Sequence, residues 1–252
     1  MEGRKRLRIF VWATYAVVLA TVVNVRTPAI ADTMSKQEFE ARVRDYLLAN
    51  PEIIVQAVQN LEARQREAEQ REAEIALLSQ AEEIFRDPDS PVGGNPTGDV
   101  TIVEFFDYNC TYCRQVAPVM TQAEATDPQL RIVYKEFPIL GSGSLYAARA
   151  ALAAHRQGRY EDFHKALMET KGQVGETLVL KVAAGVGLDV ARLTADMRDP
   201  TIQAAIDRNL ELAQSLLING TPGFVVGNQI LRGAADLSTM QQVIEQARKK
   251  KK

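Results

Sequence analysis

Two cysteines separated by two residues, Cys110 and Cys113, are the only cysteines in this 252-residue sequence. They follow a run rich in β-branched and aromatic residues, 100–106, which predicts a buried strand. Residues 114–125 after them predict a helix. A helix N-terminus has unpaired N–H groups and a partial charge of about +0.5, so it stabilises a thiolate. Cys110 is therefore the expected nucleophile, and Cys113, one turn further on, is the expected resolving thiol.

Two cysteines at this spacing have other possible uses. A zinc site needs two further ligands, and the only histidines, His155 and His164, occur in Ala-rich helical stretches where surface or packing roles are expected. A structural disulfide across two residues constrains the unfolded chain little. A redox pair without a cofactor is therefore favoured. The two thiolates could also hold Cu(I), a soft ion suited to sulfur.

The first residues predict a secretory signal peptide over 1–31. Basic residues occupy 4–8, an apolar run covers 9–23, and Ala29-Ile-Ala31 is a cleavage pattern that places the cut before Asp32. An uncleaved membrane anchor is the alternative, although the run is short for a span of about twenty residues. Export would take the cysteines out of the reducing cytosol, so the periplasm is the expected compartment. The net charge of -2 gives no indication of nucleic-acid binding.

Residues 32–88 predict a helical oligomerisation arm. Ser35-Lys-Gln-Glu38 is a capping box, and Asn50-Pro51 predicts the start of a second helix that reaches about residue 85. Apolar or small residues recur every seven positions in that helix, at Ile54, Leu61, Ala68 and Ile75. Such a helix buries little surface in its own domain, so pairing with other copies of the chain is expected. The alternative is a helix folded back on the catalytic domain.

A globular domain is expected over residues 99–248, after a linker of turn-forming residues at 89–98. The predicted order is strand, helix, strand, helical insertion at about 141–217, hairpin turning at Gly227-Asn228, and helix. Residues 249–252 form a basic tail. Without the insertion this is the order of an α/β thioredoxin fold, a central mixed sheet flanked by helices, here preceded by an all-α arm.

Three segments, 105–113, 137–141 and 220–224, resemble the DsbA family of periplasmic thiol–disulfide oxidoreductases. Residues 46–54 resemble the N-terminal region of the ScsC (suppressor of copper sensitivity) branch. The resemblance implies an enzyme whose partners are exported proteins with thiols or disulfides and a membrane redox partner. It also implies a homo-oligomer, with a trimer favoured, formed through residues 34–86.

The resemblance assigns further site residues. Pro222 is expected to be a cis-proline, which turns the backbone of Thr221 toward the sulfurs so that it can pair with an extended substrate. Thr111 and Tyr112 complete the expected substrate-binding set, and Tyr112 is expected to tune thiolate stability. Position 111 departs from the ScsC branch, which commonly has proline there.

Glu104 matches the buried acid that in this family helps to move the proton of the resolving thiol, here Cys113. A carboxylate in an apolar strand is costly unless it is used or paired. The alternative is a surface glutamate on an edge strand.

Disulfide isomerase or reductase is the favoured function, because an arm that joins catalytic domains lets them recapture the same misfolded substrate. A threonine before the cis-proline also resembles the isomerase branches. A DsbA-like oxidase is the second prediction. The remaining alternatives are a Cu(I)-binding copper-tolerance protein and a structural oligomer whose cysteines are idle.

Overall fold

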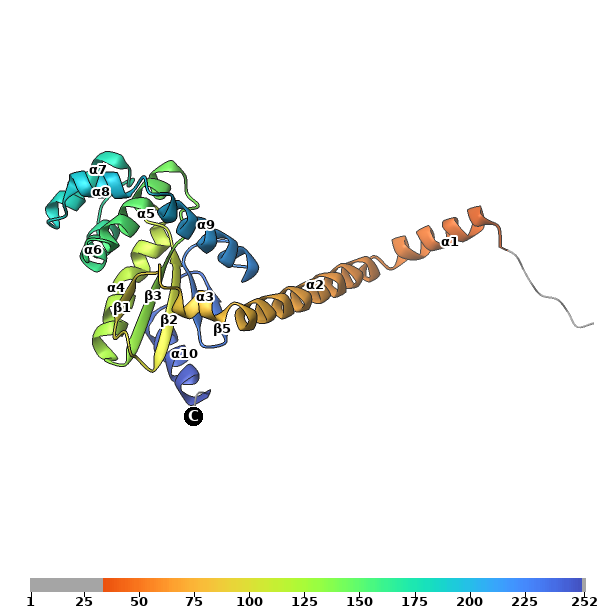
Figure 1. The fold of residues 1–252 in the computed structure, drawn as a ribbon. Helices are drawn as coiled ribbons and strands as arrows, with labels where there is room; N and C mark the ends of the chain where they lie inside the picture. The colour runs from red at the N-terminus through yellow and green to blue at the C-terminus, as the bar shows by residue number, and fades with distance from the viewer. Residues whose placement is uncertain (1–33, 251–252) are drawn as a thin grey trace, which may run out of the picture. The chain divides into compact units, whose positions relative to one another are not determined.

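The computed structural model describes residues 34–250 (Figure 1). The predicted signal peptide, its cleavage before Asp32 and the last two lysines lie outside the described residues. The chain divides into two compact units between Ala57 and Val58. Within the part of the chain that is described, no helix has the length and apolar character needed to cross a membrane.

The first unit contains α1 (Lys36–Ala49) and the start of α2 (Glu52–Ser79). The predicted capping box is confirmed: Glu38 N donates to Ser35 Oγ at 3.2 Å, and Ser35 N donates to Glu38 Oε2 at 3.3 Å. At the other end of α1, the Asn50 side chain donates to Tyr46 O at 2.8 Å. No residue of α1 is buried.

The predicted single helix from residue 51 to about 85 is wrong at one point. α2 ends at Ser79, and a separate helix, α3 (Ala81–Arg86), follows a break at Gln80. The break allows Leu77 before it and Ile84 after it to pack into one hydrophobic cluster with strand residues of the second unit. The C-terminal end of α2 therefore lies in the second unit and packs against its strands.

A five-stranded mixed sheet forms the centre of the second unit. β2 and β3 pair in parallel, whereas the β1–β3, β2–β4 and β4–β5 pairs are antiparallel. The spatial order is β1-β3-β2-β4-β5, with bounds β1 (Val92–Gly94), β2 (Val100–Phe106), β3 (Leu130–Glu136), β4 (Gly223–Val226) and β5 (Gln229–Arg232). The predicted thioredoxin fold is confirmed.

The segment 89–98, predicted as a linker, instead contributes β1 to the edge of the sheet. Its glycines serve close backbone approach. Gly94 has φ +66°, and a Cβ there would lie 2.5 Å from the Leu130 carbonyl oxygen. Asn95 N also donates to Leu130 O at 2.8 Å. Composition alone predicts a linker here because a strand partner so far along the chain leaves no local signal.

The alternation of side chains along β2 assigns its residues to two faces. Ile102 and Phe106 pack in the cluster that includes α4 (Thr111–Thr126) and α10 (Leu237–Lys250). Val103 and Phe105 pack in the cluster that includes α3 and part of α9 (Pro200–Ser215). Position 104 therefore falls on the α4 face.

The helical insertion consists of five helices that gather toward one end of the sheet (Figure 1). One of them, α8, begins after Asp189, whose side chain accepts a hydrogen bond from Arg192 N at 2.9 Å. This helix is short, so its sequence carries little periodic signal. The bounds are α5 (Ser142–His155), α6 (Tyr160–Met168), α7 (Glu176–Gly185), α8 (Val190–Asp196) and α9.

Candidate active site

The cysteine pair lies where β2 gives way to α4. Cys110 is the N-cap residue of α4, with extended backbone angles, and its Sγ accepts a hydrogen bond from Cys113 N at 3.4 Å. The sulfur therefore takes the place that a serine or aspartate oxygen takes in other caps, beside N–H groups with no partner inside the helix. Both cysteines are free thiols. This arrangement places the Cys110 sulfur at the positive end of the helix dipole.

The two thiols differ in environment. Cys113 is fully buried, whereas Cys110 retains 6% of its surface. Burial raises the pKa of the Cys113 thiol, and the Glu104 carboxylate raises it further because a second negative charge nearby is unfavourable. Cys113 thus holds its proton in the resting site. Cys110 is the thiol that a substrate can reach.

The loop before β4 lies directly against the reactive sulfur. The Thr221–Pro222 peptide bond is cis, as predicted. The Cys110 thiol donates to the Thr221 carbonyl oxygen at 3.2 Å, so this backbone faces the sulfur. Pro222 is buried, and Thr221 is half-buried. The ring of Tyr112, between the cysteines, is 62% exposed.

Glu104 lies on the central strand β2, on the face covered by α4, and is 2% exposed. This position excludes the alternative of a surface glutamate on an edge strand. Among the described residues its carboxyl group has no hydrogen-bond partner, and burial raises its pKa to about 8. The side chain borders a cavity of about 420 Å³ that Arg114 and Lys165 also line. A carboxyl group with this pKa can exchange a proton near neutral pH.

Two residues of the turn before Cys110 position the site and were not singled out from the sequence. Asp107 accepts hydrogen bonds from Asn109 N at 2.7 Å and from Leu140 N at 2.9 Å. The Asn109 side chain accepts from Val174 N at 2.7 Å and donates to Ser144 Oγ at 3.1 Å. These bonds tie the turn to the helical insertion. The Asp-x-Asn pattern before the cysteine was the available signal, since such side chains fix turns.

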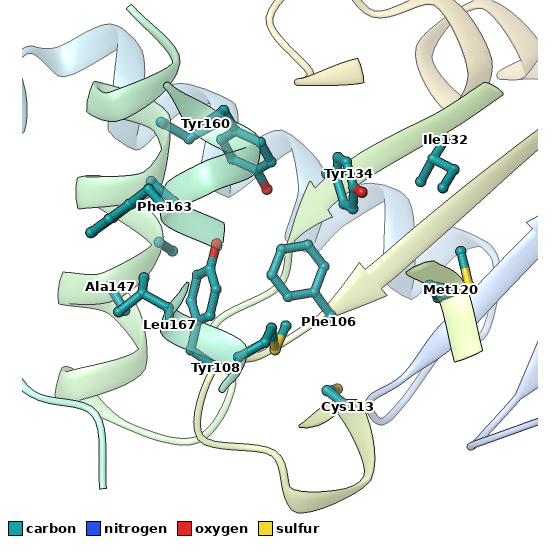
Figure 2. Close-up of a cluster of buried hydrophobic side chains, with 14 of the residues drawn as sticks. Phe106, Tyr108, Cys113, Met120, Ile132, Tyr134, Ala147, Tyr160, Phe163 and Leu167 are labelled. Carbon is teal, nitrogen blue, oxygen red and sulfur yellow. The ribbon is translucent and has the colours of Figure 1, made fainter. Parts of the chain in front are cut away.

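A second buried carboxyl group, Glu136, lies close to the site at the end of β3. Its Oε1 accepts from Tyr160 Oη at 2.8 Å and from Tyr108 Oη at 3.1 Å. Figure 2 shows the two tyrosine hydroxyl groups converging on one region between β3 and the helical insertion.

His164 stacks on Tyr160 and is buried, so it is a packing histidine, as predicted. His155 is exposed.

Among residues 34–250, no group of three or more His, Cys, Asp or Glu side chains is placed to hold a metal ion. The two thiols form a pair of possible ligands at most. The geometry is that of a thiol pair that exchanges disulfides: one accessible thiol at a helix N-terminus, one buried thiol a turn away and a backbone carbonyl beside them.

Residues 101–245 match the family model for a DsbA-like thioredoxin domain. The chain belongs to the DsbA-like family of thiol–disulfide oxidoreductases. Residues 36–68 match a second family model, the copper resistance protein ScsC N-terminal domain. The catalytic domain and the arm therefore each resemble a described family.

Solved structures give the same assignment. A thioredoxin-like oxidoreductase from Silicibacter pomeroyi is 50% identical, with a TM-score of 0.66 over 67% of this chain and 97% of that one. A linker-deletion mutant of Proteus mirabilis ScsC is 27% identical, with a TM-score of 0.68 over 85% of this chain and 95% of that one.

Among curated proteins, a Na(+)/H(+) antiporter NhaA from Herminiimonas arsenicoxydans is 30% identical over 159 residues. The match takes in 63% of this chain and 25% of the antiporter, so the chain spans about a quarter of that relative's length. Because the match covers only this part of the antiporter, it does not assign the antiporter's activity to this chain.

Proposed function

We propose that this protein is an exported disulfide isomerase or reductase that acts on misfolded or oxidised exported proteins as a homo-oligomer. The observation that carries the proposal is the exposed apolar surface of the arm, in a chain whose second unit has a complete thiol-exchange site. Large side chains of α1 and the start of α2 are more than 50% exposed, namely Phe39, Tyr46, Leu48, Ile54, Val55 and Leu61. Surface of this kind is expected to be covered by a partner.

The chemistry begins at Cys110. Its thiolate attacks one sulfur of a substrate disulfide, the substrate S–S bond breaks, and a mixed disulfide forms while the released substrate thiolate takes up a proton. In isomerisation, another substrate thiolate attacks the mixed disulfide and regenerates Cys110 without net redox change. In reduction, Cys113 gives its proton to Glu104 and attacks the Cys110 sulfur, which releases reduced substrate and leaves a Cys110–Cys113 disulfide. A membrane redox partner then supplies two electrons and two protons to restore the thiols.

The arm favours isomerisation by bringing several catalytic domains to one substrate. All four residues of the seven-residue repeat, Ile54, Leu61, Ala68 and Ile75, are exposed in the single chain. On α1 and the start of α2, Phe39, Val43, Leu47 and Ile54 line an apolar hollow of about 350 Å³. We propose that copies of the arm, three by preference, cover these residues. Tethered active sites then meet a released substrate again at high effective concentration.

Export to the periplasm is part of the proposal. It is supported by the basic, apolar and small-residue segments of residues 1–31, which have the composition of a cleavable leader. It also suits the chemistry, because substrate disulfides persist outside the reducing cytosol.

The decisive experiment is reactivation of scrambled ribonuclease by the protein spanning residues 32–252. We expect the wild type to reshuffle the disulfides and a Phe39→Glu/Val43→Glu variant to lose most of this activity while it still reduces a small disulfide. The added charges would oppose burial of the arm in an oligomer. Gln56→Glu/Gln59→Glu, which adds the same charge outside the hollow, is the matched control.

If the wild type oxidises a reduced protein but never reshuffles a scrambled one, the enzyme is an oxidase and the proposed role of the arm is wrong. Copper handling is the second candidate, favoured by the match of residues 36–68 and by two free thiols within one helical turn. Tight Cu(I) binding that needs Cys110 and Cys113, with no thiol exchange, would support it instead.

A further inference from the structure

A polar groove of about 660 Å³ runs beside the active site and has two different walls. One wall is the segment around the cis-proline and the end of β5. The other wall is helix α2, from which three residues, Arg66, Glu69 and Gln70, line the groove. All of these residues lie in the second unit, which begins at Val58. The helix that is expected to join copies of the chain therefore also borders the catalytic surface.

The groove is continuous with the reactive sulfur through two shared residues. Tyr112 and Thr221 line it, and the Thr221 carbonyl oxygen lies 3.2 Å from Cys110 Sγ. A substrate sulfur bonded to Cys110 would lie about 2.05 Å from Sγ. The residues that flank a substrate cysteine must then pass over Tyr112 and Thr221, and one direction along the chain leads into the groove.

The wall next to the cis-proline is held in place by hydrogen bonds. Arg232 Nε donates to Leu217 O at 2.8 Å, and its Nη2 donates to Leu216 O at 3.1 Å. Leu217 has φ 55°, a left-handed conformation that is costly for a leucine, and it lines the groove. Gly233 N donates to Pro222 O at 2.8 Å. The end of β5 and the cis-proline segment thus form one fixed surface.

The helical wall is held at its base. Ala73, Ala76 and Leu77, about one to three turns after the groove residues, are buried. Ser215 Oγ donates to Gln80 Oε1 at 3.0 Å, which links the end of α2 to α9. A groove between two fixed walls needs little reorganisation when a chain binds, so less binding energy is lost to ordering.

The charges of the groove favour one kind of occupant. Arg66 and Arg232 bring two cations, and Glu69 brings one anion. The ion pair between Arg66 and Glu62 is 3.5 Å long and solvent-exposed, so it restrains Arg66 only weakly. The Gln70 and Asn219 amides and the Tyr112 hydroxyl add uncharged hydrogen-bonding groups.

From these observations we infer that the groove binds an extended segment of the substrate polypeptide beside its reacting cysteine, and prefers a segment with an acidic side chain. Helix α2 is then a specificity-determining wall of the active site as well as part of the arm. The inference rests on the thiol–disulfide exchange of the proposed function and names a substrate preference for it.

The test uses the protein of residues 32–252 in its reduced form and two peptide disulfides that differ only in an Asp or a Lys next to the cysteine. Reduction forms the Cys110–Cys113 disulfide and two peptide thiols, and acid quenching with mass spectrometry gives the second-order rate constants. We expect the wild type to favour the Asp peptide. Arg66→Glu should lower the Asp-to-Lys ratio about five-fold, as reversal of an exposed charge allows, and Glu69→Arg should raise it.

The matched control is Arg64→Glu, which makes the same charge change on α2 outside the groove and should leave the ratio within a factor of two. Arg64→Glu should also reduce 2-hydroxyethyl disulfide, which is too small to reach α2, at the wild-type rate. An unchanged Asp-to-Lys ratio in both Arg66→Glu and Glu69→Arg would overturn the inference. If the wild type reduces no disulfide at all, the exchange chemistry itself is wrong, and the inference fails with it.

Discussion

Glu104 and Glu136 are two buried carboxyl groups on the same face of neighbouring parallel strands, yet their surroundings differ. Glu136 receives hydrogen bonds from two tyrosine hydroxyl groups, and Asn209 Nδ2 donates to its backbone carbonyl at 3.2 Å. Glu104 has no such partner among the described residues and borders a cavity. Burial raises the pKa of both.

Burial of a carboxyl group has a different consequence at each of the two positions. A buried carboxyl group with hydrogen-bond partners stabilises the fold and holds the helical insertion against β3. Glu104 lacks such partners in the described part of the chain and borders a cavity on the α4 side, so a carboxyl group whose pKa is raised to about 8 can exchange a proton there. We therefore propose Glu136 as a structural acid and Glu104 as a proton-transfer acid, and three predictions test this comparison.

The largest expected effect is the pH dependence that Glu104 gives to stability. Its folded pKa is about 8 against an ordinary value of 4.5, so the fold favours the protonated form. The stabilising contribution is complete below pH 4.5 and is lost as pH rises through 8. We expect the free energy of unfolding of the wild type to fall, relative to Glu104→Gln, by up to about 5 kcal/mol over that range. Urea unfolding at several pH values measures it.

The same measurements can contradict the assignment. If the difference between the wild type and Glu104→Gln stays constant from pH 4.5 to above pH 8, Glu104 is ionised throughout or is better solvated than its burial indicates. The comparison with Glu136 would then lose its basis.

The second prediction concerns Glu136. Glu136→Ala removes the acceptor of the Tyr160 hydroxyl and one of the two partners of the Tyr108 hydroxyl, which also lies 3.2 Å from His164 Nδ1. It should lower the free energy of unfolding by about 3 kcal/mol. Glu136→Gln keeps an oxygen acceptor and replaces the other oxygen with an amide donor, so it should cost less than half as much. Urea unfolding at pH 7 compares them. Equal losses for the two variants would mean that the tyrosine bonds do not stabilise the fold.

The third and smallest effect separates the two acids by rate. Glu104→Gln removes the group that accepts the Cys113 proton, so resolution of a mixed disulfide should slow about ten-fold or more. The first attack by Cys110 should be unchanged. Rapid acid quenching and mass spectrometry would detect an accumulated mixed disulfide. Glu136→Gln serves as the control and should resolve at the wild-type rate; slow resolution in both variants would remove the distinction.

Much of the site was predictable because its signals are local. The β-branched run before Cys110 and the helical sequence after it determine a strand–helix junction, and that junction places the first sulfur at a helix N-terminus. The capping box at Ser35 and the turn at Gly227-Asn228 are equally local. The cis bond before Pro222 and the buried position of Glu104 followed from family resemblance rather than from the residues alone.

Only the tertiary structure decided what depends on distant partners. Val92–Gly94 became a strand because β3 offers it backbone groups, α2 broke at Gln80 because Leu77 and Ile84 both reach the sheet, and Glu136 gained its role from tyrosines on other elements. The sequence by itself determined where the reactive sulfurs lie and which fold carries them, since strand, cap and turn preferences act within a few residues. Contacts between residues far apart in the chain decided which of the two acids is hydrogen-bonded and which helix borders the active site.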